Sequence, residues 1–337
     1  MDKESLATVA SAIVAPGKGI LAADESTPTM GKRLALINQE NTEANRRDFR
    51  QALFDTESME HFISGVILFE ETLEQKSEDG TRLSNILESK GVYPGIKVDK
   101  GAHPMDDSPS EKITKGLDGL YERCIDFYKL GARFAKWRAV ITIGDKIPTD
   151  NCIQANASAL AKYAKACQDA NLVPIVEPEV LMDGNHTIQT CYEVSEKTLR
   201  TTFNELEKEE VYLPGILLKP NMVISGKECP VQADMNEVAQ MTVKCLMASV
   251  PKEVPGIVFL SGGQSETEAT EHLNAMNAMG EYPWKLSFSY GRALQQSALH
   301  SWAGDNANLG TTYATFYHRA EMNSKACHGE YSPELEI

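Results

Sequence analysis

The sequence predicts an α/β protein, a (β/α)8 TIM barrel. Eight short apolar segments alternate with longer segments of helical periodicity over the 337 residues. Gly or Pro stands close to many of the apolar segments, as is typical of parallel strands buried on both faces. No G-x-G-x-x-G or Walker lysine loop is present, so an open nucleotide-binding sheet is disfavoured. Eight strands with helical crossovers therefore favour a closed barrel.

The first expected element is a short helix over the apolar run from Leu6 to Ala15. Asp2 and Glu4 offset Lys3 before this run, so it lacks the basic flank of a signal peptide. The predicted strands follow, and most are rich in Val, Ile, Leu or Phe. In chain order they are Gly19–Ala23, Gly65–Phe69, Gly95–Val98, Arg133–Val140, Val173–Val180, Gly215–Leu218, Gly256–Leu260 and Leu286–Ser289.

Helices are expected between the strands and at the end of the chain. Periodicity predicts one helix over Asn151–Ala170 and another, with a charged outer face, over Thr187–Glu209. Ser265-x-x-Glu268 is a capping box that opens a third. An additional helix is expected at roughly Thr311–Met322, and the sequence after Cys327 becomes acidic and irregular.

Composition and net charge exclude several classes of protein. With 42% hydrophobic and 24% charged residues the chain resembles a soluble enzyme. No linker or repeat interrupts it, so we expect one domain over 1–337, with 328–337 irregular. A net charge of −15 argues against general binding of nucleic acid or of anionic membranes. No apolar run approaches about 18 residues, so no transmembrane helix is expected. Seven scattered cysteines without a C-x-x-C motif indicate reduced thiols in the cytoplasm.

Charged residues gather at the carboxyl ends of the predicted strands, where barrels place their chemistry. Strand side chains alternate, so Lys136 and Arg138 point the same way, as do Glu177 and Glu179. Taken singly, each of these residues is better explained as a helix cap, a turn residue or part of a structural ion pair. Ion pairs between buried charges rarely compensate for the hydration that those charges lose, so structural roles do not explain so many of them together. Their concentration at the strand ends therefore indicates an active site. The segments are Asp24-Glu25-Ser26, Lys97-Val98-Asp99-Lys100, Lys136-Trp137-Arg138, Glu177-Pro178-Glu179, Lys219, Ser261-Gly262-Gly263 and Gly291-Arg292.

Lys219 is the strongest candidate nucleophile. It lies in the apolar run from Gly215 to Val223, where an ammonium group is costly. Burial disfavours the charged amine and repulsion from Lys136 adds to this, so Lys219 is expected to be neutral and able to form a Schiff base. Glu177 would transfer protons during dehydration of the carbinolamine. The structural alternative is a lysine that snorkels from the end of a core strand.

A phosphate site is expected after the last two strands. Ser261-Gly262-Gly263 offers backbone N–H groups ahead of the helix that Ser265 opens. Arg292, at the end of the next strand, adds a planar bidentate donor. Barrels often hold phosphate at this place, although the Ser-Gly-Gly segment alone would also fit a plain turn.

Seven motifs in order resemble class I fructose-1,6-bisphosphate aldolase over nearly the whole chain. They are Ala15–Thr27, Gly95–Gly101, Phe134–Arg138, Pro174–Glu179, Leu217–Met222, Phe259–Ser265 and Phe288–Leu294. The resemblance implies that Lys219 forms an imine with the ketose C2 carbonyl and that Asp24 takes the C4 hydroxyl proton. Glu177 would be the acid and base of imine formation, with Lys136 and Glu179 balancing charge.

The resemblance also implies where the two phosphates bind. Ser261, Gly262 and Arg292 would hold the C1 phosphate. Residues for the C6 phosphate would be Ser26, Arg33, Lys97, Arg138 and Ser289. The family further implies a cytoplasmic homotetramer of glycolysis or gluconeogenesis that uses no metal or other cofactor.

Two positions depart from the family pattern. Pro28-Thr29 stands where many members have Gly-Ser, so the C6-phosphate loop is expected to differ in shape. The family has a mobile C-terminal tail ending in Tyr; this sequence stops at Ile337, and Tyr331 matches an earlier position. Without that tail, slow release of the triose phosphate is expected.

Three alternatives remain open at this point. A metal-dependent aldolase would need clustered histidines, whereas the seven here are scattered without ligand spacing. The same chemistry on sedoheptulose 1,7-bisphosphate or fructose 1-phosphate is equally compatible with the motifs. A non-catalytic scaffold on the same fold is the third, since a fold alone never proves activity.

Overall fold

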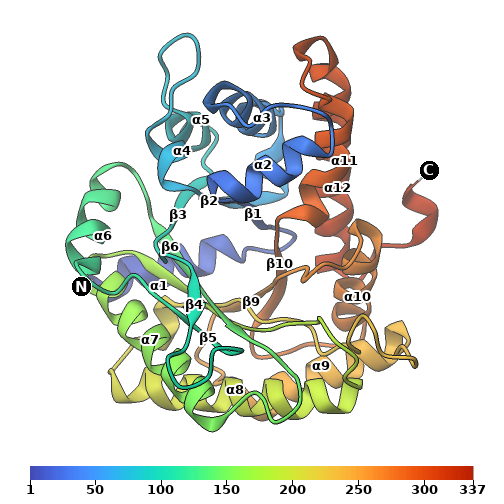
Figure 1. The fold of residues 1–337 in the computed structure, drawn as a ribbon. Helices are drawn as coiled ribbons and strands as arrows, with labels where there is room; N and C mark the ends of the chain where they lie inside the picture. The colour runs from blue at the N-terminus through green and yellow to red at the C-terminus, as the bar shows by residue number, and fades with distance from the viewer. Residues whose placement is uncertain (337) are drawn as a thin grey trace.

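Eight parallel strands close into a barrel (Figure 1) in the computed structural model, which describes residues 1–336. Their order around the barrel is β1-β10-β9-β8-β7-β6-β3-β2. The predicted (β/α)8 barrel is therefore confirmed. Its strands are β1 Gly19–Ala23, β2 Ile63–Leu68, β3 Tyr93–Lys97, β6 Phe134–Ile141, β7 Val173–Val180, β8 Leu217–Leu218, β9 Gly256–Phe259 and β10 Lys285–Tyr290.

Helices surround this barrel (Figure 1), and a two-stranded antiparallel hairpin lies outside it. The helices are α1 Lys3–Ile13, α2 Thr27–Ala35, α3 Glu43–Asp55, α4 Glu70–Glu74, α5 Leu83–Ser89, α6 Leu120–Lys129, α7 Asp150–Asp169, α8 Ile188–Lys208, α9 Met235–Ser249, α10 Glu266–Ala278, α11 Arg292–Trp302 and α12 Leu309–Cys327. The hairpin is β4 Ala102–Pro104 with β5 Lys112–Thr114, and the 3-10 turns are η1 Met59–His61, η2 Leu213–Gly215, η3 Asn306–Asn308 and η4 Pro333–Glu336.

Side-chain caps fix where several helices begin. The Thr149 hydroxyl accepts a hydrogen bond from the Cys152 N–H at the start of α7. Thr187 does the same for the Thr190 N–H at the start of α8. Ser265 and Glu268 form both bonds of the predicted capping box. Each cap satisfies backbone N–H groups that lack a partner within the helix.

The side chains that face into the barrel change in character along β6 and β7. Near the amino ends they are apolar, and Phe134 and Ile175 pack in one cluster with Leu6 of α1. Two residues further along, on the same face, Lys136 follows Phe134 and Glu177 follows Ile175. Helix α1 thus contributes to the apolar amino end of the barrel, and charged groups collect at the carboxyl end.

Glycines let the Phe134 ring fill the barrel interior. A Cβ on Gly95 would lie 2.2 Å from a ring carbon of Phe134, and one on Gly65 would lie 2.9 Å from another. No side chain fits at either position beside that ring. The ring forms a floor beneath Lys136, because the two residues share a face of β6.

The C-terminal end folds back on α12. After Cys327 the described chain has no regular element until η4. Glu336 there accepts hydrogen bonds from His318 Nε2 at 2.9 Å and from the Tyr331 hydroxyl at 2.9 Å, and pairs with Arg319. Ile337, the last residue of the segment expected to be irregular, lies outside the described residues. No helix in residues 1–336 is both long and apolar enough to cross a bilayer.

Candidate active site

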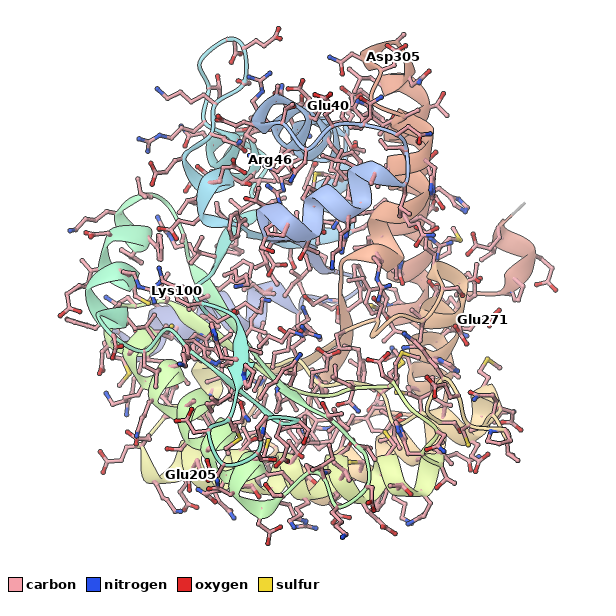
Figure 2. All side chains as sticks on the ribbon, viewed as in Figure 1. Glu40, Arg46, Lys100, Glu205, Glu271 and Asp305 are labelled. Atoms are coloured by element: carbon pink, nitrogen blue, oxygen red, sulfur yellow. The ribbon has the colours of Figure 1, made fainter. Side chains whose placement is uncertain are left out.

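A cavity of about 910 Å³ opens at the carboxyl ends of the strands. Side chains exposed on the outer surface include the carboxylates of Glu40 and Asp305 (Figure 2), whereas lysines and arginines converge on this cavity. Each residue for which the sequence predicts a catalytic role or a place in one of the two phosphate sites lines it, except Gly263 of the predicted phosphate turn. These residues are Asp24, Ser26, Arg33, Lys97, Lys136, Arg138, Glu177, Glu179, Lys219, Ser261, Gly262, Ser289 and Arg292.

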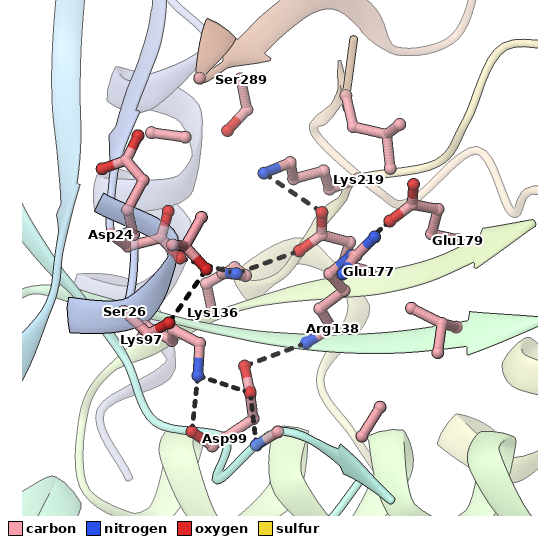
Figure 3. Close-up of a pocket in the computed structure, with 18 of the residues that line it drawn as sticks. Asp24, Ser26, Lys97, Asp99, Lys136, Arg138, Glu177, Glu179, Lys219 and Ser289 are labelled. Atoms are coloured by element: carbon pink, nitrogen blue, oxygen red, sulfur yellow. Dashed lines mark hydrogen bonds and ion pairs between the residues drawn. The ribbon is translucent and has the colours of Figure 1, made fainter. Parts of the chain in front are cut away.

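Glu177 lies between two buried lysines (Figure 3). Its Oε1 is 3.3 Å from Nζ of Lys219, and its Oε2 is 3.5 Å from Nζ of Lys136. Sequence reasoning expected Lys136 to act on Lys219 by repulsion; the structure places a carboxylate in contact with both. Strand geometry explains this arrangement, because β7 lies between β6 and β8 in the barrel.

Asp24 completes the central cluster from the end of β1. Its Oδ2 is 2.7 Å from Nζ of Lys136. Burial by itself would raise the pKa of Asp24, but the charges of Lys136, Lys219 and Lys97 lower it to about 2. The carboxylate therefore stays ionised at neutral pH and can accept a proton.

Lys136 keeps its proton for the same reason. Burial opposes its charge, yet Asp24, Glu177 and Asp99 together raise the pKa of the Lys136 ammonium well above its ordinary value. A permanently charged Lys136 holds the two carboxylates close together and cannot itself act as a base.

Two further ion pairs fix the neighbouring wall of the cavity. Arg138 pairs with Glu179, so the guanidinium reaches one strand over from β6 to β7. Lys97 Nζ lies 2.6 Å from Asp99 Oδ1 and also donates to the Asp99 carbonyl at 2.8 Å. The second carboxylate oxygen of Asp99 accepts the Arg138 backbone N–H at 3.4 Å. Asp99 therefore joins the end of β3 to β6.

The end of β1 is held by a buried network around Glu25. Arg33 of α2 pairs with the Glu25 carboxylate. Arg50, fully buried in α3, donates to the Glu25 carbonyl at 2.7 Å and lies 3.6 Å from its carboxylate. Gln295 of α11 donates to Glu25 Oε1 at 3.0 Å. Three helices thus position the residue that follows Asp24.

Helix α2 presents its amino end to the cavity. Ser26 is the N-cap residue, but its hydroxyl bonds that of Thr29 at 3.0 Å instead of a backbone N–H. Thr29 is exposed and lines the cavity, so the Pro28-Thr29 departure still presents a hydroxyl there. Pro28 costs no hydrogen bond at the first turn of a helix.

The segment predicted to bind phosphate forms a turn after β9. Gly262 and Gly263 adopt left-handed φ values of 57° and 95°, which favour glycine. Arg292 begins α11 directly after β10 and lines the same cavity. Ser289 Oγ is buried and has no hydrogen-bond partner within residues 1–336, so it is available to a ligand.

The structure also brings charged residues to the cavity for which the sequence predicted no role, among them Glu25, Asp99, Asp183 and Lys227. Glu25 and Asp99 carried a signal, since they belong to charged strand-end segments already noted. No sequence pattern marked Asp183 and Lys227, because they lie on longer loops. Among residues 1–336 no group of three His, Cys, Asp or Glu side chains is arranged to hold a metal ion.

Comparison with known proteins agrees with this geometry. Residues 5–336 match the family model described as fructose-bisphosphate aldolase class-I. The chain is 54% identical over 332 residues to "Probable fructose-bisphosphate aldolase class 1" of Xanthomonas axonopodis pv. citri, covering 98% of this chain and 99% of that one. It is 51% identical to "Fructose-bisphosphate aldolase" of Dictyostelium discoideum, covering 98% and 94%.

A solved structure gives the same result. Fructose-bisphosphate aldolase from Plasmodium falciparum, in complex with TRAP and a small molecule inhibitor, matches with a TM-score of 0.97 and 51% identity. The match covers 98% of this chain and 96% of that one. Together with the family model, these similarities extend over the whole barrel. This chain belongs to the class-I fructose-bisphosphate aldolase family.

Proposed function

We propose that this protein cleaves fructose 1,6-bisphosphate reversibly into dihydroxyacetone phosphate and glyceraldehyde 3-phosphate, as a metal-independent lyase of glycolysis or gluconeogenesis. The observation that carries the proposal is the contact of buried Lys219 with Glu177 at 3.3 Å inside a cavity that holds further cations. A lysine beside a proton carrier is what Schiff-base chemistry requires.

The reaction begins at the ketone carbon. After Lys219 has passed its proton to Glu177, the neutral amine adds to C2 of the ketose and forms a carbinolamine. Glu177 then protonates the C2 hydroxyl, which leaves as water, and the product is a protonated imine. This cation is the electron sink for the next step.

Cleavage follows at the opposite end of the central cluster. Asp24 accepts the proton of the C4 hydroxyl, the C3–C4 bond breaks, and its electron pair moves to the imine nitrogen. Glyceraldehyde 3-phosphate leaves, and an enamine remains on Lys219. Return of this proton from Asp24 to C3 gives the protonated imine again, and addition of water at C2 then releases dihydroxyacetone phosphate and the Lys219 amine. Lys136 and Glu179 keep the local charges balanced throughout.

The two phosphates would bind at opposite sides of the cavity. We assign the C1 phosphate to Ser261, Gly262 and Arg292, because the left-handed turn directs backbone N–H groups at an anion. The C6 phosphate is assigned to the side formed by the start of α2, where the ligands would be Ser26, Arg33, Lys97, Arg138 and Ser289.

We further propose that the enzyme is a cytoplasmic homotetramer with one domain per chain. Support for the compartment comes from the seven cysteines, all of which are free thiols. Support for a single domain is that residues 19 to 290 contribute all eight barrel strands. The tetramer is the assembly that the family resemblance implies.

A cleavage assay tests the reaction. The purified enzyme should release both triose phosphates from fructose 1,6-bisphosphate in the presence of EDTA, and Lys219→Met should abolish release. Comparison of kcat/KM for fructose 1,6-bisphosphate, fructose 1-phosphate and sedoheptulose 1,7-bisphosphate identifies the preferred substrate. Inhibition by EDTA, or full activity of Lys219→Met, would overturn the proposal.

A further inference from the structure

Lys227 reaches the phosphate nest from a loop outside the described catalytic cluster. A Cβ built on Gly263 would lie 2.8 Å from Nζ of Lys227 and 3.0 Å from Nη2 of Arg292. The two cationic groups therefore converge on the same point in front of the Gly262-Gly263 turn. Lys227 also lines the cavity that holds Lys219.

The backbone that carries Lys227 is firmly held. Its N–H donates to the Met182 carbonyl at 2.9 Å, and the N–H of Gly226 donates to the His186 carbonyl at 2.8 Å. A Cβ on Gly226 would lie only 2.3 Å from the Gly184 carbonyl oxygen, so the two loops are in close contact. The backbone at Lys227 is thus fixed, while its side chain is 44% exposed and can move.

Within the described part of the chain, the Lys227 ammonium has one weak ionic partner. Asp183 Oδ1 lies 3.5 Å away, and both side chains are well exposed, so this pair contributes little. Within residues 1–336, Arg292 makes no ion pair. Two cations beside a turn with left-handed glycines repel each other, and a bound anion would relieve that repulsion. The arrangement lacks the negative charge that a phosphate supplies.

We propose that Lys227 is a binding residue for the phosphate on the ketone side of the substrate and moves from Asp183 to that phosphate when substrate enters. This inference rests on the proposed function and adds a ligand to it. The turn would donate backbone N–H groups to the phosphate, and the planar guanidinium of Arg292 would bind two of its oxygens. Lys227 would add a positive charge on a flexible side chain. Its contact does not change during bond cleavage, so it affects binding and leaves the chemical steps unchanged.

Kinetics of Lys227→Met test the proposal, with Lys252→Met as the control because Lys252 is exposed and does not line this cavity. Loss of one charge-assisted contact should raise KM by about tenfold for both fructose 1,6-bisphosphate and fructose 1-phosphate, since both carry the C1 phosphate. The kcat should stay within about twofold of wild type. Lys227→Arg should restore most of the affinity, and Lys252→Met should match wild type.

The substitution Asp183→Asn should change KM in the opposite direction to Lys227→Met. Removing the competing carboxylate should lower KM about twofold in the wild-type background and have no effect in the Lys227→Met background. An unchanged KM in Lys227→Met, or a loss confined to kcat, overturns the proposal. So does an Asp183→Asn effect that persists without Lys227.

Binding of inorganic phosphate separates this inference from the proposed function. Calorimetric titration of wild type and Lys227→Met with inorganic phosphate needs no turnover. Weaker phosphate binding in Lys227→Met supports the site even if the enzyme failed to cleave fructose 1,6-bisphosphate. Equal binding in an enzyme that does cleave it refutes the role of Lys227 and leaves the aldolase assignment intact.

Discussion

Glu177 and Lys219 face each other from adjacent strands, with Glu177 Oε1 3.3 Å from Lys219 Nζ. The other oxygen of the same carboxylate lies 3.5 Å from Lys136, whose proton is firmly held. One carboxylate thus contacts both the proposed nucleophile, Lys219, and a lysine that keeps its proton. This asymmetry supports our proposal that Lys219 is the nucleophile and that Lys136 gives electrostatic support.

Glu177→Gln tests the proton-transfer role. Glutamine keeps the shape but can neither take a proton from Lys219 nor deliver one to the C2 hydroxyl. Formation and hydrolysis of the imine should slow by about 10² to 10⁴. Single-turnover measurements with trapping by borohydride follow the imine directly. Imine formation at the wild-type rate would show that another group carries the proton.

Asp24 should make the stability of the protein depend on pH in acid. Its pKa in the folded protein is about 2, below the ordinary value of 3.8, so it contributes stability above pH 3.8 that is lost as the pH falls through 2. The contribution is about 2 kcal/mol. Urea unfolding of wild type and Asp24→Asn between pH 2 and pH 6 measures it. The difference between the two proteins should shrink toward low pH; a constant difference would contradict the ionised state of Asp24.

Arg50 should control the position of the substrate end that lies near α2. Arg50→Met leaves the buried Glu25 carboxylate with one cation fewer and should destabilise the protein by about 3 kcal/mol. Because Glu25 also holds Arg33, KM should rise more for fructose 1,6-bisphosphate than for fructose 1-phosphate, which lacks the C6 phosphate.

The matched control for that variant is Arg46→Met. Arg46 lies in the same helix, is also buried, and pairs with Glu71 at 2.5 Å, with no contact to Glu25. It should lose stability and keep the ratio of the two KM values. A similar change of this ratio in both variants would mean that stability alone, and not the position of Arg33, sets the effect.

Gly95→Ala should disturb the barrel floor beneath the catalytic groups. Its methyl group would overlap the Phe134 ring, and overpacking of this kind costs about 1 to 3 kcal/mol. Gly310→Ala is the control, because no atom lies within 4 Å of its Cβ position in α12, and alanine there should stabilise by up to about 1 kcal/mol. Thermal unfolding compares the two. Equal effects would contradict the packing described for Phe134.

Local sequence patterns predicted the strands well, because each is short, apolar and buried on both faces. Strands β1 and β7 match their predicted bounds, whereas the predicted strand Gly215–Leu218 is reduced to Leu217–Leu218. Leu213–Gly215 forms a 3-10 turn there, which is a local conformation that apolar composition does not reveal. No bounds were predicted for helices α2 to α6, α9 and α11 or for the β4–β5 hairpin.

The site was predictable where period-two alternation applies. Lys136 and Arg138, like Glu177 and Glu179, face the cavity as their spacing required. The contacts of Arg50 with Glu25 and of Lys227 with the Gly263 turn were not predictable, since they join segments 25 and 36 residues apart through helices and loops with no fixed register. Such contacts depend on how elements pack, and no local pattern encodes that.

Mapping of the covalent adduct tests the central assignment most directly. The enzyme is incubated with dihydroxyacetone phosphate, reduced with borohydride and digested, and the modified peptide is identified by mass spectrometry. We expect one reduced triose phosphate adduct, attached to Nζ of Lys219 and absent from Lys219→Met. An adduct on Lys136 or Lys227, or undiminished labelling of Lys219→Met, would contradict it.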